Sequence, residues 1–297
     1  MEFEKRFPDD ASCRAYLTAI RWPNGIACPR CGAHKGNEIR RNLWRCSACR
    51  YETSVMAGTI FQDSKLPLTL WFRAMWQMTS QKNGLSAMGL QNVLGLGSYR
   101  TAWLMLHKLR SAMVRPERER LCGAVEVDET YYGAPEDGVS GRETEKKALI
   151  AIAAEVRPGN TIGRIRLCHI PDVRRETLHG FIGQAIEPGS TVITDGLQAY
   201  RDLCGYIHQR HIRKHLPEDP DALLPRVHRV ASLLKRWLLG THQGAVSHEY
   251  LDGYLNEFTF RFNRRKSKSR GKLFYRLAQL AVQVDPKPAS LIIHRTQ

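Results

Sequence analysis

The sequence predicts a chain of several domains: a small cysteine-rich module, an all-α region, and an α/β domain that ends in helices. Three observations predict this order. Two Cys-x-x-Cys pairs stand close together near the N-terminus, and residues 66–113 show helical periodicity. From residue 124 on, β-branched runs alternate with helical segments. At 297 residues the chain is long enough to form two or three domains.

The cysteine spacing predicts a metal site in the first module. Cys28 and Cys31 form one pair, and after 14 residues Cys46 and Cys49 form the second. Two such pairs are typical of a structural, tetrahedral Zn²⁺ site with no open position. The alternative is that one pair is a redox Cys-x-x-Cys motif and the spacing of the other pair is a coincidence. Residues 1–61 are thus expected to form a zinc ribbon with an N-terminal helix. The other four cysteines are expected to be buried free thiols: Cys13, Cys122, Cys168 and Cys204.

Residues 62–116 are predicted to form three helices, over 67–80, 86–94 and 99–113. Gly95-Leu-Gly-Ser98 is a tight turn between the last two, which is the arrangement of a helix-turn-helix. The N-terminal end of the third helix would then enter the major groove of DNA. The candidate contacts there are Ser98, Tyr99, Arg100 and Thr101, with His107 and Lys108 able to reach phosphate. An ordinary three-helix bundle is the alternative.

Residues 120–285 are predicted to form the α/β domain. The expected strands are 124–128, 147–156, 163–170, 191–195 and 206–213. The expected helices are 173–186, 197–203, 226–241 and 247–265. This order is that of the ribonuclease-H-like fold: three strands, a helix, a strand, a helix, a strand and then helices.

Two aspartates stand at the ends of predicted strands in this domain. Asp128 follows Ala124-Val-Glu-Val127, and Asp195 follows Thr191-Val-Ile-Thr194. Such runs deliver carboxylates to the edge of a sheet. Paired carboxylates can hold two divalent metal ions roughly 3.5–4 Å apart for phosphodiester cleavage. A turn or a helix cap is the alternative for either aspartate alone.

A third ligand is expected near the start of the helix at 226. Pro225–Arg236 contains no acid, but His228 and Lys235 are seven residues apart and share one helix face, about 10 Å apart along the axis. His228 could bind metal and Lys235 could bind phosphate. A solvated helix face is the alternative, and the nearest carboxylates that could replace His228 are Glu218, Asp219 and Asp221.

The charge of the chain indicates the class of its partner. The net charge is +16, from 45 Lys+Arg against 29 Asp+Glu, so a polyanion is expected. Nucleic acid is the first candidate, and a ribosome-associated or membrane-surface role is the second. No apolar run approaches the roughly 20 residues of a membrane span. The first residues lack the apolar stretch of a signal peptide. We therefore expect a cytoplasmic protein with no membrane partner.

Several motifs in this order resemble one known family, the bacterial insertion-sequence transposases of the zinc-ribbon group with a DDE-type catalytic domain. The resemblance covers nearly the whole chain. Its motifs are Cys28–Gly32, Arg41–Cys49, Ala57–Phe61, Val127–Gly133, Thr194–Gly196, Ser232–Arg236 and Leu255–Arg265. The resemblance implies a catalytic set of Asp128, Asp195, His228 and Lys235. In the family the third position is Glu or Asn, so His228 departs from the pattern.

The resemblance also implies cofactors and partners. It implies structural Zn²⁺, catalytic Mg²⁺ or Mn²⁺ at Asp128, Asp195 and His228, and double-stranded DNA as terminal inverted repeats and as target. A nucleoid-associated homo-oligomer is expected in the active complex. Phosphate would be held by a basic segment: Arg264, Arg265, Lys266, Lys268 and Arg270. The alternatives are a non-catalytic zinc-dependent DNA-binding protein and a ribonuclease-H-like repair nuclease.

Overall fold

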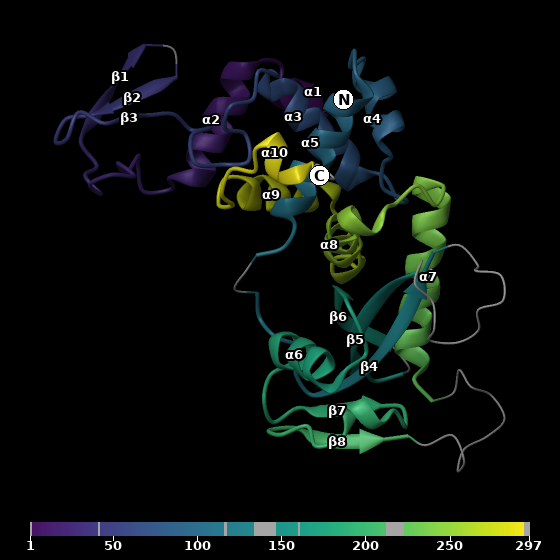
Figure 1. Ribbon diagram of the computed structural model, residues 1–297. Helices are drawn as coiled ribbons and strands as arrows, with labels where there is room; N and C mark the ends of the chain where they lie inside the picture. Colours follow the sequence, from purple (N-terminus) through teal and green to yellow (C-terminus); the bar gives the residue numbers. More distant parts are fainter. Residues whose placement is uncertain are drawn as a thin grey trace. The chain divides into compact units, whose positions relative to one another are not determined.

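The chain forms two compact units (Figure 1). The computed structural model describes residues 2–40, 42–115, 118–133, 147–159, 161–211 and 223–293. The first unit is discontinuous and lies within residues 1–116 and 267–297, whereas the second lies within residues 117–266.

The first unit combines a small sheet with a group of helices. In chain order its elements are α1 (Glu2–Arg6), α2 (Asp10–Arg21), β1 (Gly36–Arg40), β2 (Leu43–Cys46), β3 (Glu52–Thr53), α3 (Leu68–Ser80), α4 (Ala87–Leu94), α5 (Tyr99–Ala112), α9 (Arg270–Ala281) and α10 (Ala289–Ile292). The strands pair antiparallel in the order β1-β2-β3. Their core consists mainly of Trp44 with Cys28 and Cys46. So small a core leaves the ribbon with little apolar stabilisation of its own.

Helix α9 belongs to the first unit, although it follows the second unit in the chain. It packs against α2, α3 and α5. Phe274 of α9 lies in a cluster of aromatic rings. The rings around it are those of Phe3, Phe7, Tyr16, Phe72 and Trp76. The predicted domain 120–285 is therefore longer at its C-terminal end than the second compact unit, because residues 267–285 lie in the first.

A tight turn joins α4 to α5. Gly95 adopts the left-handed conformation, with φ of 62°, and the amide of Leu96 donates to the carbonyl of Gln91 at 3.0 Å. This arrangement ends α4 and redirects the chain. Ser98 occupies the N-cap position of α5, but its side chain makes no capping hydrogen bond. Helices α3, α4 and α5 lie within one residue of their predicted bounds.

The second unit is a five-stranded mixed sheet with helices on both faces. Its elements are β4 (Ala124–Tyr132), β5 (Ala148–Arg157), β6 (Thr161–Ile170), α6 (Arg175–Ala185), β7 (Thr191–Thr194), η1 (Gln198–Tyr200), β8 (Ile207–Arg210), α7 (Pro225–His242), η4 (His248–Tyr250) and α8 (Leu251–Asn263). The strand order is β6-β5-β4-β7-β8. Strands β4, β7 and β8 are parallel, and β5 is antiparallel to β4 and β6. This order is consistent with the predicted ribonuclease-H-like topology.

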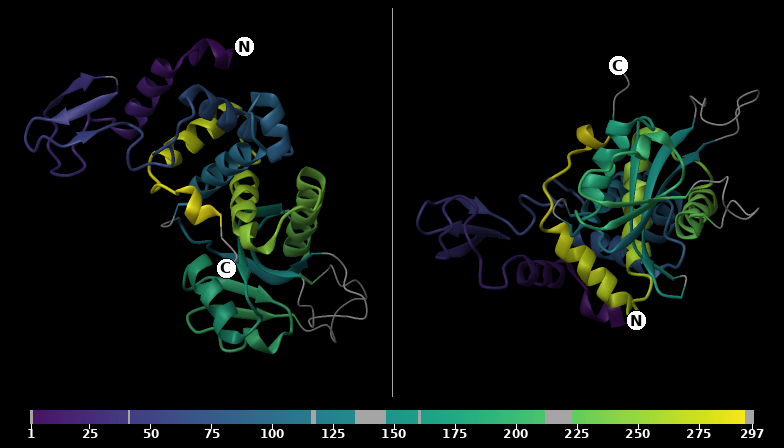
Figure 2. Two further views of the ribbon diagram at one scale, coloured as in Figure 1. Left: turned by 45° about the horizontal axis from the view of Figure 1, so that its top comes forward. Right: turned by 90° about the horizontal axis from the view of Figure 1, so that it is seen from below.

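The sheet separates two apolar cores. Ile150 and Ile152 of β5 pack with residues of α7 and α8, whereas Leu149 and Ala151 pack with residues of α6. Because β5 is buried on both faces, its first seven residues, Ala148 to Ala154, form a continuous apolar run. Figures 1 and 2 show α6 on the side of the sheet opposite to α7.

Two elements of the second unit differ from their predicted form. Strand β4 was expected to end at Asp128 but continues to Tyr132, because residues 129–132 pair with β5. The helix expected at 197–203 is a single 3-10 turn, η1. Among the described residues, no helix has both the length and the apolar character of a membrane span.

Candidate functional site

The four thiols of the ribbon converge on one point. Sγ of Cys28 lies 3.6 Å from that of Cys49, and the Cys31–Cys46 distance is 3.7 Å. All four Sγ atoms lie within 4.8 Å of one another. A disulfide needs about 2.05 Å, whereas tetrahedral zinc with Zn–S bonds of about 2.3 Å places its sulfurs about 3.8 Å apart. The thiols therefore fit a structural zinc ion with four protein ligands.

Each cysteine pair is held by the same kind of turn. The amide of Gly32 donates to the carbonyl of Cys28 at 2.8 Å, and the amide of Arg50 donates to that of Cys46 at 3.0 Å. Both donors have positive φ, 73° for Gly32 and 62° for Arg50. Glycine adopts this conformation freely, but an arginine is strained there. The sequence marks the first turn by its glycine, and nothing marks the second.

The remaining cysteines differ in exposure. Cys13 is buried and Cys168 is half-buried, whereas Cys122 and Cys204 are exposed. The prediction that all four are buried is wrong for the last two, because they lie in the connections that precede β4 and β8.

Asp128 and Asp195 lie on neighbouring parallel strands. Strand β4 pairs with β7 so that Glu126 stands opposite Ile193. Continuing this register by two residues places Asp128 opposite Asp195, on strands about 4.8 Å apart. Asp195 directly follows β7, whereas Asp128 lies in the middle of β4.

A buried tyrosine connects the two segments that carry these carboxylates. The hydroxyl of Tyr200, in η1, donates to Oε2 of Glu129 at 2.9 Å. Burial, followed by the charges of Glu129 and the two aspartates, raises the pKa of Tyr200 well above its ordinary value. The hydroxyl therefore stays protonated and remains a donor. Oδ1 of Asp195 accepts the amide of Leu197 at 2.9 Å, which fixes the start of the same loop.

Helix α7 brings His228 to Asp128. Nε2 of His228 lies 3.2 Å from Oδ2 of Asp128. Oδ1 of the same carboxylate accepts the amide of Glu129 at 2.9 Å. The His228 side chain is 30% exposed and that of Asp128 is 17% exposed, so a metal ion can reach both from solvent.

Glu126 holds the first turn of α7 against β4. Its Oε2 accepts the amides of Arg226 at 2.8 Å and Val227 at 3.0 Å, and its Oε1 accepts from the Arg226 guanidinium at 2.7 Å. The N-cap residue of α7, Leu224, provides no side-chain cap. A carboxylate on the neighbouring strand thus satisfies the first amides of the helix. No motif in the sequence singles out Glu126, because it lies inside a short apolar run.

A cavity of about 790 Å³ lies along α7 and is lined by His228 and Lys235. Arg229 and Arg236 also line it. Burial, followed by the charge of Lys147, lowers the pKa of Lys235. Its lining cations, Arg229, Lys235 and Arg236, make the cavity basic. Its volume is ordinary for a ligand-binding site. It can accept a phosphate group beside the His228–Asp128 pair.

Arg210 places a guanidinium at the loop that follows β7. It is the last residue of β8, and its guanidinium donates to the carbonyl of Gly196 at 3.0 Å. The register of β7 and β8 sets Arg210 opposite Thr194. A guanidinium in this position can stabilise negative charge on a phosphate. No motif in the sequence singled out Arg210.

The donor types at this edge of the sheet, two carboxylates and an imidazole, are ones that divalent cations accept. Mg²⁺ prefers oxygen ligands, and Mn²⁺ accepts imidazole nitrogen more readily. Asp128 and His228 are in contact, and Asp195 comes from the neighbouring strand. In the part of the chain that the structure describes, only the four cysteines bring three or more such donors within 4.8 Å of one another. The alternative third ligands Glu218, Asp219 and Asp221 lie outside the described residues.

The predicted recognition residues lie at the start of α5 and are exposed or half-buried: Ser98, Tyr99, Arg100 and Thr101. Tyr99 is 50% exposed, which leaves its ring available to a partner. Lys108 is half-buried, and burial lowers its pKa. His107 is buried and lies 3.2 Å from the guanidinium of Arg110. The expectation that His107 reaches phosphate is therefore wrong.

The cations of the predicted basic segment divide into two groups. Arg264 donates to the carbonyl of Phe260 at 3.1 Å. Arg265 donates to the carbonyls of Gly163 at 3.2 Å and of Ile162. These two guanidinium groups therefore have internal partners that compete with phosphate. The other cations of the segment are exposed: Lys266, Lys268 and Arg270.

Comparisons with known proteins agree with this architecture. A family model described as "Transposase zinc-ribbon domain" matches residues 8–52, and one described as "ISXO2-like transposase domain" matches residues 120–263. The chain is 28% identical over 296 residues to a protein of Halobacterium salinarum, "Uncharacterized protein in transposable element ISH50". That match covers 86% of this chain and 92% of the relative.

Proposed function

Because this chain belongs to the insertion-sequence transposases that carry a transposase zinc ribbon and an ISXO2-like transposase domain, we propose that it cleaves and transfers DNA. It binds the terminal inverted repeats of its element, cleaves at these ends, and joins the freed strands to a target. The reaction is hydrolysis of a phosphodiester followed by transesterification, with no covalent protein–DNA intermediate.

The observation that carries this proposal is the register of β4 and β7. The pairing runs to Glu126 and Ile193, and its continuation by two residues would bring Asp128 of β4 opposite Asp195, which directly follows β7. Central strands are rigid, and a rigid pair of carboxylates is what metal-dependent phosphodiester cleavage requires. His228 completes the donor set through its contact with Asp128.

The residues around this set have separate roles. Asp128, Asp195 and His228 would hold Mg²⁺ or Mn²⁺, and the bound metal would supply activation of water and of the 3′-hydroxyl and positive charge for the phosphate. Lys235 binds a DNA phosphate in the same cavity as His228. Arg210 donates to the carbonyl of Gly196 in the loop after β7 and supplies positive charge there.

DNA binding in this proposal involves both units. The ribbon and the helix-turn-helix formed by α4 and α5 recognise the repeats, with Tyr99 and Arg100 at the exposed start of α5. The exposed cations Lys266, Lys268 and Arg270 contact phosphate. Two ends must be held together for transfer, so the active complex is a homo-oligomer.

The test uses Asp128→Asn and Asp195→Asn with a linear DNA that carries the inverted repeats, in Mg²⁺ and in Mn²⁺. Each variant should lose cleavage and strand transfer but still bind the ends. Asp202→Asn is the control, because Asp202 is exposed and pairs with Arg175 on the surface. Near-normal strand transfer by either variant would show that the site is elsewhere. A wild-type protein that binds the repeats and never cleaves them would favour the non-catalytic DNA-binding protein.

A further inference from the structure

A carboxylate of β4 is buried beside the apolar cluster on the α7 side of the sheet. Glu126 is only 2% exposed. It lies on the same face of β4 as Asp128, two residues on, because side chains alternate along a strand. Residues of β5, α7 and α8 on this side form an apolar cluster. A buried carboxylate destabilises a fold strongly unless it is hydrogen-bonded and paired.

Helix α7 supplies all the partners that Glu126 needs. Two backbone amides of its first turn and the Arg226 guanidinium donate to the carboxylate, at 2.7 to 3.0 Å. The positive end of the helix dipole adds to this attraction. The bonds bring Arg226 and Val227 to Glu126, while the next residue, His228, contacts Asp128.

Strand and helix are thus joined at two successive points. Along β4 the points are Glu126 and Asp128, about 6.6 Å apart. Along α7 they are the amide of Val227 and the imidazole of His228, one residue apart. The first point contains an ion pair and two hydrogen bonds from backbone amides, whereas at the second Nε2 of His228 lies 3.2 Å from Oδ2 of Asp128. The stronger attachment therefore determines where the weaker contact can form.

We propose that Glu126 is a positioning residue that holds His228 at Asp128 for metal binding. By fixing the first turn of α7 on β4, it fixes the direction from which the imidazole approaches the carboxylate. This inference rests on the metal site of the proposed function. Residues that orient a metal ligand commonly change metal affinity by about 10- to 100-fold when they are replaced.

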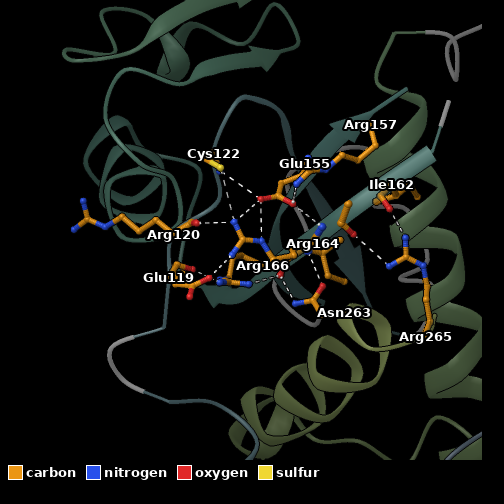
Figure 3. A network of polar contacts seen from close by, with 12 residues as sticks. Glu119, Arg120, Cys122, Glu155, Arg157, Ile162, Arg164, Arg166, Asn263 and Arg265 are labelled. Carbon is orange, nitrogen blue, oxygen red and sulfur yellow. Dashed lines mark hydrogen bonds and ion pairs between the residues drawn. The ribbon is translucent and has the colours of Figure 1, made fainter. Parts of the chain in front are cut away.

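The same sheet offers a matched control. Glu155 of β5 is also fully buried, and its carboxylate accepts from Nε of Arg164 at 2.9 Å and from its NH2 at 2.7 Å (Figure 3). The carboxylate also accepts a hydrogen bond from the backbone amide of Arg164 at 2.9 Å. The Glu155 network therefore resembles that of Glu126 in burial and bonding, but Figure 3 shows no residue of α7 among its labelled members.

The experiment measures Mn²⁺ affinity by calorimetry on the full-length, zinc-loaded protein without DNA. Glu126→Gln should weaken Mn²⁺ binding by about tenfold or more, whereas Glu155→Gln should leave it unchanged. His228→Ala should also weaken it. If Glu126 acts through His228, the double variant should bind no more weakly than His228→Ala alone. Circular dichroism checks that each variant is folded, and Glu126→Asp replaces Glu126→Gln in the same cycle if the latter does not fold.

Three outcomes would overturn the inference. Unchanged Mn²⁺ affinity in Glu126→Gln would show that Glu126 does not position a ligand. Losses that multiply in the double variant would show that it acts without His228. Equal Mn²⁺ affinity in the wild type and in Asp128→Asn would show that the proposed metal site does not exist. That last result would refute the proposed function, whereas the first two would leave it intact.

Discussion

Phe274 lies against Phe72 with their ring centroids 5.5 Å apart and their planes at 63°. Phe72 is on α3 and Phe274 is on α9, so the C-terminal part of the chain completes the core of the N-terminal unit. Both rings are almost fully buried. The helices proposed to recognise DNA therefore depend on a helix that is encoded after the α/β domain.

Phe274→Ala should destabilise the first unit by about 3–5 kcal/mol, because it opens a cavity in this aromatic cluster. Denaturant unfolding followed by tryptophan fluorescence measures the change. Tyr275→Ala is the control, since Tyr275 is 44% exposed and should lose less than about 1 kcal/mol. Equal losses in the two variants would contradict the role given to α9.

Removal of zinc should unfold the ribbon, because its apolar core is small. Elemental analysis should find about one zinc per chain, and Cys46→Ser should lose it. Cys204→Ser is the control, because Cys204 is exposed and lies outside the cluster. Full zinc occupancy in Cys46→Ser, or four freely titratable ribbon thiols in the wild type, would refute the site.

Replacement of Lys266, Lys268 and Arg270 by Gln should reduce the salt dependence of DNA binding. Each phosphate contact contributes about 0.9 to the slope of log K against log salt. Arg265→Gln should chiefly lower thermal stability, because its guanidinium donates to the carbonyls of Gly163 and Ile162. The measurement is DNA affinity over a salt series for each variant. An unchanged slope in the triple variant would exclude these cations from the DNA contact.

In the proposed reaction, His228 should give a preference for Mn²⁺ over Mg²⁺. A neutral imidazole lacks the negative charge of Glu, and Mg²⁺ binds nitrogen poorly. His228→Glu should therefore improve activity in Mg²⁺ relative to Mn²⁺, and His228→Ala should impair turnover more than DNA binding. Strand transfer by the three proteins in each metal tests this. His228 has no catalytic part if His228→Ala equals the wild type in both.

DNA binding should weaken at alkaline pH through Lys235. Burial, followed by Lys147, lowers the pKa of Lys235. Its positive charge is present below that pKa and disappears as the pH rises through it, earlier than for an exposed lysine. Lys235→Arg, whose pKa stays above about 12, should keep its affinity to higher pH. Anisotropy measurements with DNA over a pH series compare the two, with the exposed Lys272→Arg as control. Identical pH profiles for the wild type and Lys235→Arg would contradict this role.

Local patterns predicted much of the fold. The cysteine spacing predicted the ribbon, and the turn at Gly95 predicted the bounds of α4 and α5. The end of β4 was not predicted, because the polar residues Glu129 and Thr130 resemble a turn until they are seen paired with β5. The place of α9 was not predicted either, because its packing on α3 is a long-range contact that no local periodicity reports.

In the candidate site too, local patterns predicted some residues, whereas others depend on long-range contacts. Asp128 and Asp195 were found because each follows an apolar run. Glu126 and Arg210 were missed because their roles depend on which helix and which loop lie next to their strands. Arg264 and Arg265 were assigned to phosphate from charge alone, whereas their guanidinium groups reach carbonyl oxygens that only the fold brings near.

The discontinuous first unit also affects how damaged copies of such a gene behave. During synthesis, the N-terminal unit cannot close its core until the ribosome has added Phe274 and the rest of α9. A stop codon in the α/β domain therefore yields a chain without the helix that completes the aromatic core of the first unit. Under the proposed function, such a fragment should bind the element ends poorly, so truncation by itself should not create a repressor.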